Sequence, residues 1–506
     1  MRAAPLREAA LSARRQPHYE RRRPEQTPLY QLVRAHYETF AAGVAACGAT
    51  LPPFVKDEFA AYLDCGILAH GFLRLSCDTC ARDTLVAFSC KRRGICPSCG
   101  TRRMAETAAD LVDNILPPVP VRQWVLSFPI PLRSLFAIHP ELITPVLHII
   151  QRAIHSHHLK QTGVPRDSGA SGCITLIQRF GSAANLNIHL HGLMLDGVYQ
   201  SGNADSEPIF IEALPPSQQQ LQTLLGKIIK RIMKLLTRLG YLIEEDGIIY
   251  LARTDDTDPD NVLAPLQAAS STWRIAQGPR AGRKVLTLVG RNAERFRHDV
   301  PHVNSAVGTA ARFDLLANEQ GFSLHAGVRC EANDRQGIEQ LCRYITRPAI
   351  SNERLSIDQQ GNAVLKLKTA WRNGTTHIVL TPMEFMQRLA ALIPRPRLHL
   401  IRFHGVLAPN AKLRSKVVPV SPQKTTAGEG DCDHEHSKPL RMTGARLLKR
   451  VFDIDIEQCK CGGKLKLIAV IEEPAVIGKI LKHIGLDPQP PPRAPAHKRA
   501  DLLEWA

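Results

Sequence analysis

The sequence predicts a mixed α+β protein in which a small cysteine-rich domain precedes a larger domain with an antiparallel sheet. Six cysteines fall within residues 65–99, close to the N-terminal end. Two strand-like runs, 173–180 and 186–195, are joined by a short turn, which indicates a β-hairpin. Helix-like spacing of apolar residues occurs on both sides of this hairpin, at 141–157 and 217–240. This combination of helices with an antiparallel hairpin is typical of an α+β fold.

The composition favours a polyanionic partner. Lysine and arginine total 65 against 47 acidic residues, which gives a formal net charge of +18. A basic protein with a solvated surface is the alternative interpretation. No run reaches the ~18 apolar residues that a membrane helix needs, and the basic N-terminal arm lacks the apolar core of a secretory signal. We therefore expect a cytoplasmic protein with no membrane contact.

Four of the clustered cysteines have the spacing of a structural zinc site. Cys77 and Cys80 form one C-x-x-C pair, Cys96 and Cys99 form another, and 15 residues lie between the pairs. Two such pairs hold one Zn²⁺ tetrahedrally in zinc-ribbon-like domains. In a long chain without an export signal, disulfides are the less favoured interpretation. We therefore predict that these four thiolates bind zinc.

The remaining cysteines give weaker signals. Cys65 and Cys90 are left over from the predicted zinc site, and we do not expect them to form a second one. Cys459 and Cys461 resemble half of a zinc-binding pair, and a turn with incidental cysteines is the favoured alternative. Side chains just upstream in the sequence are candidates to complete that half-site, namely Cys432, His434 and His436.

The sequence divides into several expected segments. Pro117 and Pro118 end the cysteine-rich part, 420–440 has the composition of a linker, and 488–499 is rich in proline, which predicts disorder. The expected boundaries are a disordered basic arm at 1–26, a helical and zinc-binding domain at 27–118, a main domain at 119–415 with a helical insertion at about 202–300, a linker at 416–440, a small module at 441–486 and a tail at 487–506.

Two histidines in the second hairpin strand are candidate metal ligands. Alternate side chains of a strand share a face, so Asn187, His189 and His191 point the same way. Two neighbouring imidazoles on a rigid strand can converge on one cation. An isolated pair of this kind is more often structural, so its context decides the interpretation.

Tyr344 is the candidate nucleophile. It lies on a predicted helix that Asn333 and Asp334 can cap and that Pro348 ends. A phenol keeps its proton until about pH 10, so it needs positive charge nearby to act as a nucleophile at neutral pH. Arg343 and Arg347 flank Tyr344 and can also bind a phosphate. A tyrosine at the edge of an amphipathic core is the alternative.

Several motifs together resemble a known family. They are Phe88–Lys91 with Cys96–Cys99, Gln178–Ser182 leading into His189–His191, Cys342–Pro348, and Arg402–Asn410. These stretches resemble insertion-sequence-ninety-one-type transposases, which belong to the HUH superfamily of single-strand nucleases. The resemblance covers residues 30–415, with a weaker similarity at 441–486.

The resemblance implies a ferredoxin-like HUH core in the 119–415 domain. It implies that Tyr344 attacks a DNA phosphodiester, forming a 5′-phosphotyrosine and releasing a 3′-hydroxyl that can prime replication. His189 and His191 would hold Mg²⁺ or Mn²⁺, with zinc as the competing assignment. Hard cations prefer oxygen ligands, so Gln178 is the expected third ligand. Weaker candidates for that position are His325 and Gln340.

The implied partner is DNA, in the form of single-stranded transposon ends in rolling-circle-type transposition, and host replication proteins are further candidate partners. Some relatives carry two tyrosines one helical turn apart, and Gln340 occupies the earlier position here. The two-tyrosine scheme is therefore open for this chain. A plasmid relaxase or replication initiator of the same superfamily is the nearest alternative, and a nonenzymatic zinc-ribbon DNA-binding protein is the other.

Overall fold

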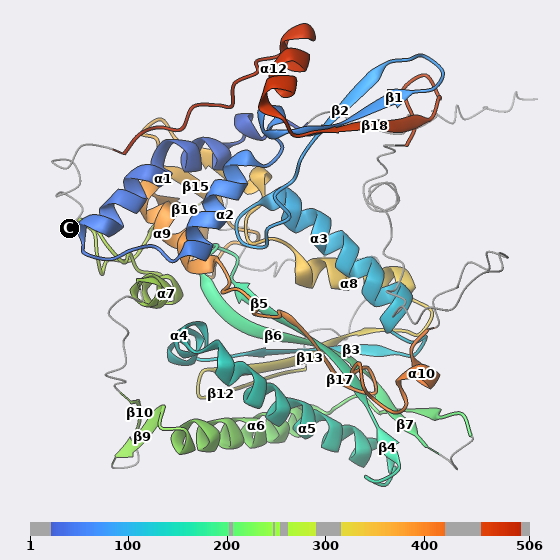
Figure 1. Cartoon of the computed structure of the whole chain (residues 1–506). Helices are drawn as coiled ribbons and strands as arrows, with labels where there is room; N and C mark the ends of the chain where they lie inside the picture. Colours follow the sequence, from blue (N-terminus) through green and yellow to red (C-terminus); the bar gives the residue numbers. More distant parts are fainter. Residues whose placement is uncertain are drawn as a thin grey trace, which may run out of the picture. The chain divides into compact units, whose positions relative to one another are not determined.

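A computed structural model of the chain divides into two compact units (Figure 1). Unit 1 comprises Met1–Pro24, Gly66–Ser89 and His436–Pro490, and unit 2 comprises Glu25–Cys65, Cys90–Glu435 and Pro491–Ala506. This division cuts across the predicted 27–118 domain, because residues 66–89 group with the C-terminal module. The structure describes residues 22–201, 206–245, 248–252, 262–289, 315–419 and 457–496.

Two helices near the start of unit 2 lie in the segment predicted to be helical and zinc-binding, 27–118. They are α1, Pro28–Ala46, and α2, Pro53–Asp64. Thr27 caps α1 by accepting a hydrogen bond from the backbone N–H of Tyr30. The helical structure is interrupted between α1 and α2 because proline cannot continue a preceding helix. Pro52 and Pro53 instead stand at the start of α2, where proline is tolerated.

The main element of unit 2 is a six-stranded sheet in the order β12-β13-β3-β6-β5-β17, with every neighbouring pair antiparallel. The predicted hairpin is confirmed as β5 and β6. Its second strand, which carries His189 and His191, lies inside the sheet between β3 and β5. The bounds are β3 Val121–Ser127, β5 Gly172–Phe180, β6 Leu186–Leu195, β12 Leu316–Glu319, β13 Phe322–Cys330 and β17 Ile401–Gly405.

Helices cover both faces of this sheet (Figure 1). On one face lie α4, α5 and α6, and on the other lie α3 and α8. The predicted amphipathic helix at 217–240 is confirmed as α6, whose apolar stripe is buried. The bounds are α3 Pro97–Asp110 with a π-helical turn at Leu111–Ile115, α4 Ile130–Ile138, α5 Ile143–Thr162, α6 Gln218–Arg238 and α8 Arg335–Thr346.

The chain order of the central strands follows a simple pattern. From β3 the chain crosses through α5 to β5 and returns along β6, which lies between β3 and β5. After α6 it comes back as β13, on the other side of β3. Helices α5 and α6 contact each other on the same face of the sheet. The four strands therefore stand in the spatial order β13-β3-β6-β5, which is fourth, first, third and second along the chain.

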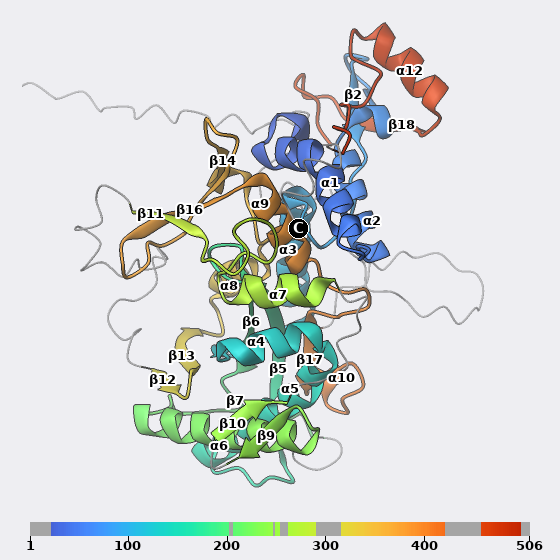
Figure 2. The same ribbon diagram turned by 90° about the vertical axis from the view of Figure 1, so that its left-hand side faces the viewer.

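Smaller sheets and helices complete unit 2. One sheet of four strands, β11-β16-β15-β14, lies beside α9 and apart from the central sheet (Figure 2). The bounds are β4 Gly169–Ala170, β7 Gly197–Gln200, β8 Ile209–Glu212, β9 Leu242–Glu245, β10 Ile248–Leu251, β11 Leu286–Val289, β14 Leu355–Ile357, β15 Ala363–Lys366, β16 Thr375–Leu380, α7 Leu263–Ser271, α9 Pro382–Leu392 and α10 Arg414–Val417.

The proline-rich tail is partly ordered, contrary to the predicted disorder at 488–499. Arg493 forms an ion pair with Asp64 at 2.9 Å, and the backbone N–H of Ala494 donates to the carbonyl of Arg34. Proline supplies extended backbone that does not need its own secondary structure, so such a segment can still pack against α1 and α2.

The described part of unit 1 contains a small three-stranded sheet, β18-β1-β2, and the helix α12. Its buried apolar cluster, among the described residues, consists of Leu68, Phe72, Ile477 and Leu481, with a few half-buried neighbours. The N-terminal strands therefore share their core with a C-terminal helix. The bounds are β1 Phe72–Cys77, β2 Asp83–Ala87, β18 Leu465–Ile471 and α12 Pro474–His483.

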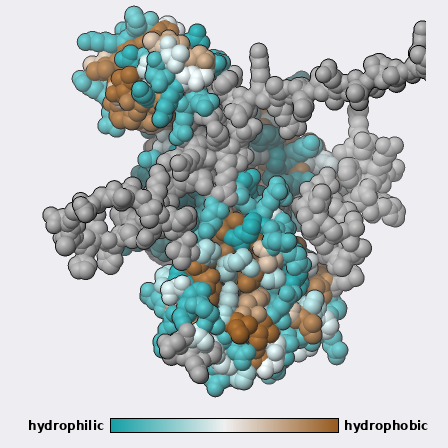
Figure 3. Space-filling view, turned by 90° about the vertical axis from the view of Figure 1, so that its right-hand side faces the viewer, coloured by the Kyte–Doolittle hydropathy of each residue, from teal (hydrophilic) through white to brown (hydrophobic). Residues whose placement is uncertain are grey.

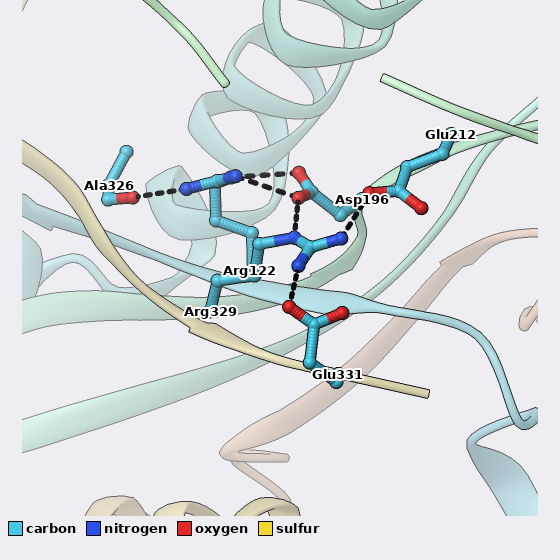
Figure 4. A network of polar contacts seen from close by, with 6 residues as sticks. All are labelled: Arg122, Asp196, Glu212, Ala326, Arg329 and Glu331. Atoms are coloured by element: carbon cyan, nitrogen blue, oxygen red, sulfur yellow. Dashed lines mark hydrogen bonds and ion pairs between the residues drawn. The ribbon is translucent and has the colours of Figure 1, made fainter. Parts of the chain in front are cut away.

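A network of ion pairs joins three strands of the central sheet, β3, β6 and β13 (Figure 4). Asp196, directly after β6, accepts two hydrogen bonds from Arg122 on β3, both at 2.8 Å, and one from Arg329 on β13 at 2.7 Å. Arg122 also donates to the carbonyl of Ala326. Arg122 and Arg329 are directly paired across the strands, so the Asp196 carboxylate offsets the repulsion between them.

We predict that Asp196→Ala lowers the free energy of unfolding of unit 2 by about 3–5 kcal/mol, because it leaves the buried Arg122 guanidinium without its counter-charge. Urea-induced unfolding would measure the change. Glu331→Gln is the matched control, because Glu331 pairs with the same Arg329 but its side chain is 63% exposed. A similar small effect for both variants would contradict the structural role of the Asp196 carboxylate.

Candidate active site

The two histidines of β6 lie side by side on one face of the central sheet, with ring centroids 4.9 Å apart. His189 is directly opposite Gln178 on β5 and Ser127 on β3. Directly opposite residues of antiparallel strands share a face. Gln178, the predicted third ligand, therefore stands on the same face as both imidazoles, beside His189. We call this surface the histidine face.

Both imidazoles are oriented through Nδ1. His189 Nδ1 lies 2.9 Å from the carbonyl oxygen of Asn187, and since a carbonyl only accepts, Nδ1 carries the proton and Nε2 keeps its lone pair. His191 Nδ1 lies 2.8 Å from the amide Nε2 of Gln123 on β3, and since an amide nitrogen only donates, Nδ1 accepts and Nε2 of His191 carries the proton. That Nε2 is buried and has no hydrogen-bond partner among the described residues. Metal-binding histidines donate the proton of one ring nitrogen and bind the ion through the other, so His189 has this arrangement, and His191 would reach it once the Gln123 amide turns to present its oxygen to Nδ1.

Burial keeps the imidazoles neutral. Desolvation lowers the pKa of His189 to about 4, with further lowering from the positive charge of Arg347. Desolvation, the neighbouring His189 and Arg347 lower the pKa of His191 well below its usual range. Neutral imidazole is the form that binds a metal ion, so both side chains are in the ligand form at neutral pH.

Helix α8 packs on the histidine face and carries Tyr344. The helix begins at a capping Asp334, which accepts a hydrogen bond from the N–H of Gly337, as the sequence predicted. Cys342 and Ile345 on its buried side belong to one apolar cluster with Leu176, the residue opposite His191. The side chain of Gln178 donates to the carbonyl of Ile345 at 2.7 Å. Gln178 therefore joins the histidine strands to the residue next to Tyr344.

Two cations lie against the Tyr344 ring, which is 42% exposed. The guanidinium of Arg347 is 4.4 Å from the ring centroid, and the ammonium nitrogen of Lys368 is 5.1 Å from it. Arg347 also lies over the ring of Phe180, at the end of β5. Because the charge of Arg347 also lowers the pKa of both histidines, one guanidinium connects the phenol with the imidazole pair.

Sequence reasoning missed Lys368 and Gln123. Partial burial, together with the charges of Arg347 and Arg354, lowers the pKa of Lys368 to about 8. Lys368 follows β15 and belongs to no motif, so only the folded chain brings it to Tyr344. The available sequence signal for Gln123 was that its side chain is polar although its strand is largely buried.

The remaining predicted site residues, Arg343, Gln340 and His325, are less clearly part of the site around Tyr344 and the two histidines. Arg343 forms an ion pair with Glu339 one turn earlier on α8, so part of its charge is already balanced. Gln340 is exposed on the same helix. His325 is directly opposite Val125, which in turn is opposite His191. His325 is therefore two strands, about 10 Å, from His191 and is a poorer third ligand than Gln178.

A separate group of four thiols in unit 2 has the geometry of a zinc site. Cys65 ends α2, Cys90 lies in the following loop, and Cys96 and Cys99 start α3. Neighbouring sulfur atoms are 3.4–3.7 Å apart. Four thiolates at about 2.3 Å from one Zn²⁺ stand about 3.8 Å from each other, so the group fits a tetrahedral zinc ion. Hydrogen bonds from the other three thiols lower the pKa of Cys99.

Two regions of the chain match family models of transposases. Residues 32–128 match the model Zn_Tnp_IS91, described as a transposase zinc-binding domain, and residues 172–415 match the transposase model Y2_Tnp. The chain belongs to the IS91-type transposases. The first region contains all four thiols of the unit 2 group, which supports a structural zinc there. The second contains β5, β6, α8 and their candidate residues. No curated protein and no solved structure matches the chain.

The predicted zinc ligand set is wrong in its grouping. The structure does not bring Cys77 and Cys80 to Cys96 and Cys99. It places the latter two with Cys65 and Cys90, which were expected to form no site, and it places Cys77 and Cys80 with Cys459 and Cys461. The physical reason is that residues 66–89 belong to unit 1, so the first C-x-x-C pair leaves unit 2 with that segment. The upstream candidates Cys432, His434 and His436 lie outside the described residues.

The transposase carries no helix, within the described parts of the chain, that is long and apolar enough to cross a bilayer. Its membership of a transposase family, together with the zinc-binding domain, indicates that it binds DNA. Its excess of 18 positive charges is consistent with a polyanionic partner.

We predict that Cys90→Ser lowers the zinc content of the purified transposase by about one ion per chain and lowers its thermal midpoint, because zinc binding contributes directly to the folding of such a site. Elemental analysis would measure the zinc. Cys47→Ser is the control, because Cys47 is exposed and outside both thiol groups. Unchanged zinc content in Cys90→Ser would show that this group is not a zinc site.

Proposed function

We propose that this transposase cleaves and rejoins single-stranded DNA through Tyr344, with a divalent cation held by His189 and His191. The main support is that His189 keeps the lone pair of Nε2, and that the buried Nε2 of His191 has no partner among the described residues, on the face that α8 covers. The position of Arg347, in contact with the Tyr344 ring and close enough to affect both histidines, adds to it. A guanidinium at this place can bind the phosphate that both groups would share.

The proposed fold of the catalytic part is a ferredoxin-like HUH core. The strand order fourth-first-third-second, with β3-α5-β5 straddling β6, is the split βαβ arrangement of that fold. The two crossover regions place α5 and α6 on one face. This leaves the histidine face for the catalytic groups and for α8.

The donor set fits a small divalent cation if Gln178 takes part. The Nε2 atoms of His189 and His191 would supply two ligands, the second after the Gln123 amide turns so that its oxygen accepts the Nδ1 proton of His191. The buried Nε2 of His191, which has no partner among the described residues, favours an ion at this place. Gln178 uses its amide N–H₂ on the carbonyl of Ile345, so its Oε1 is the atom left to act as an oxygen ligand. Bound Mg²⁺ or Mn²⁺ would supply positive charge that polarises the scissile phosphate.

The chemical step is a phosphoryl transfer to the phenol. The Tyr344 oxygen forms a bond to phosphorus while the bond from phosphorus to the 3′-oxygen breaks, giving a 5′-phosphotyrosine. We assign the phenol proton to Lys368, whose pKa of about 8 leaves part of its amine neutral at physiological pH. The resulting ammonium can then protonate the leaving 3′-oxygen. Protons therefore balance across the step.

Rolling-circle-type transposition would use the released 3′-hydroxyl as a primer and then reverse the same chemistry to join strands. Gln340 lies one turn before Tyr344, at the position of a second tyrosine in some relatives. In this chain one phenol must therefore serve both steps, or a second protomer must provide another.

Tyr344→Phe should abolish the covalent adduct between the protein and a 5′-ended single-stranded DNA fragment, because it removes the attacking oxygen. The adduct would be detected on a denaturing gel after incubation with Mg²⁺ or Mn²⁺, with Zn²⁺ as a comparison. DNA binding should stay within about a factor of two.

The matched control is Tyr250→Phe, because Tyr250 is 49% exposed and lies outside the site. Adduct formation by Tyr344→Phe would rule out the proposed nucleophile. A wild-type protein that binds DNA but forms no adduct with any of these cations would favour the nonenzymatic alternative.

Lys368 gives the cleavage rate a predicted pH dependence. Since its neutral amine is the proton acceptor, the single-turnover rate should rise with pH and level off above about pH 8. Lys368→Met should lower the rate by about 10² or more and remove this rise. Lys368→Arg keeps the positive charge but cannot lose its proton, so it should also be slow. Wild-type activity in Lys368→Arg would show that the charge alone matters.

A further inference from the structure

Unit 1 contains a second group of four thiols, contributed by two segments that are distant in the sequence. Cys77 and Cys80 come from the turn after β1, and Cys459 and Cys461 precede β18. Sulfur separations are 3.4 Å for Cys77 and Cys461 and 3.6 Å for Cys80 and Cys459, and all four lie within 4.8 Å of one another. These separations exceed the ~2.05 Å of a disulfide and match the ~3.8 Å edges of a zinc tetrathiolate.

The backbone of both turns is folded around this group. In the first turn, the backbone N–H of Cys80 donates to the Cys77 sulfur. In the second, the N–H of Gly463 donates to the Cys461 sulfur. N–H groups that point at sulfur stabilise the thiolate form, which is the form that binds a metal ion.

Two glycines allow the second turn to reach the first. Gly462 has φ of +88°, a conformation that glycine adopts without strain. At Gly463, a Cβ atom would lie 2.6 Å from the Cys77 sulfur and 2.5 Å from the Thr79 hydroxyl, so only glycine fits against the first turn. The close approach of the two turns is therefore a specific feature of the sequence Cys-Lys-Cys-Gly-Gly.

Backbone hydrogen bonds continue the contact on either side of the thiols. Asp78 donates its N–H to the carbonyl of Lys464 and accepts the N–H of Lys464 with its carboxylate. From there β1 and β18 pair as antiparallel strands, with Cys77 opposite Leu465. The four thiols thus stand at the end of this ladder.

Among the described residues, the apolar core of unit 1 is small. Its four buried members have four half-buried neighbours, and Leu467, Ile468 and Val470 on β18 are 54–58% exposed. Figure 3 shows brown, apolar surface on unit 1. Small units with little apolar burial need a disulfide or a metal ion to be stable.

We propose that Cys77, Cys80, Cys459 and Cys461 bind a second zinc ion, which fastens the C-terminal segment 457–490 to the N-terminal hairpin of β1 and β2. Neither matched family region contains all four ligands, because one ends at residue 128 and the other at residue 415. The transposase is therefore a two-zinc protein, and its C-terminal module is part of a zinc-dependent unit with residues 66–89.

The zinc content of the full-length chain tests this proposal. Wild-type protein should contain about two zinc ions per chain, and the double variant Cys459→Ser with Cys461→Ser should contain about one. Cys65→Ser with Cys90→Ser should also retain about one, and Cys47→Ser should retain two. One zinc ion in the wild type, or two in the Cys459 and Cys461 double variant, would overturn the proposal.

Limited proteolysis of the wild-type protein tests whether zinc attaches the segment 457–490 to the hairpin of β1 and β2. This experiment does not depend on the folding of a variant. Treatment with a strong zinc chelator should expose the segment 457–490 to cleavage, since it loses the bond to Cys77 and Cys80, and added Zn²⁺ should restore protection. Cleavage that is independent of chelator would overturn the proposal. Neither readout involves Tyr344 or DNA, so each outcome is independent of the proposed strand cleavage.

Discussion

The central position of β6 is the constraint on which the candidate active site depends. Because β6 pairs with β3 on one side and β5 on the other, its alternation fixes which side chains face α8. A shift of its register by one residue would turn His189 and His191 to the opposite face of the sheet. The flanking strands contribute the polar partners, Gln123 from β3 and Gln178 from β5, so the site requires all three strands in one register.

The two faces of the central sheet carry different polar groups. Behind the sheet, Arg122, Arg329 and Asp196 form a buried network in which every described charge has a partner. On the histidine face, the buried Nε2 of His191 has no partner among the described residues. An unpaired polar atom costs stability, and proteins retain such atoms where a ligand supplies the missing contact. An ion bound at the histidines would supply that contact.

Local sequence patterns predicted the elements of the site but not all of its members. The hairpin, the capped helix of Tyr344 and the shared face of His189 and His191 follow from periods of two and about four residues along the chain. Gln178 was also within reach, because the hairpin turn sets its register against His189. Lys368 was not, because it reaches Tyr344 from a separate segment after β15, and no local pattern encodes that contact.

The cysteines show why spacing alone is an unsafe guide to ligand sets. The two cysteines of each C-x-x-C pair do lie in one group, but the two pairs do not share a group. The second pair groups with Cys65 and Cys90, and the first pair groups with Cys459 and Cys461. Cys65 and Cys90 directly bracket the segment 66–89, which belongs to unit 1. A zinc ion bound by both residues closes the point at which that segment leaves and re-enters unit 2. If residues 66–89 were removed from the sequence, Cys65 would be followed directly by Cys90. The segment 66–89 is therefore an insertion between two ligands of one compact zinc site.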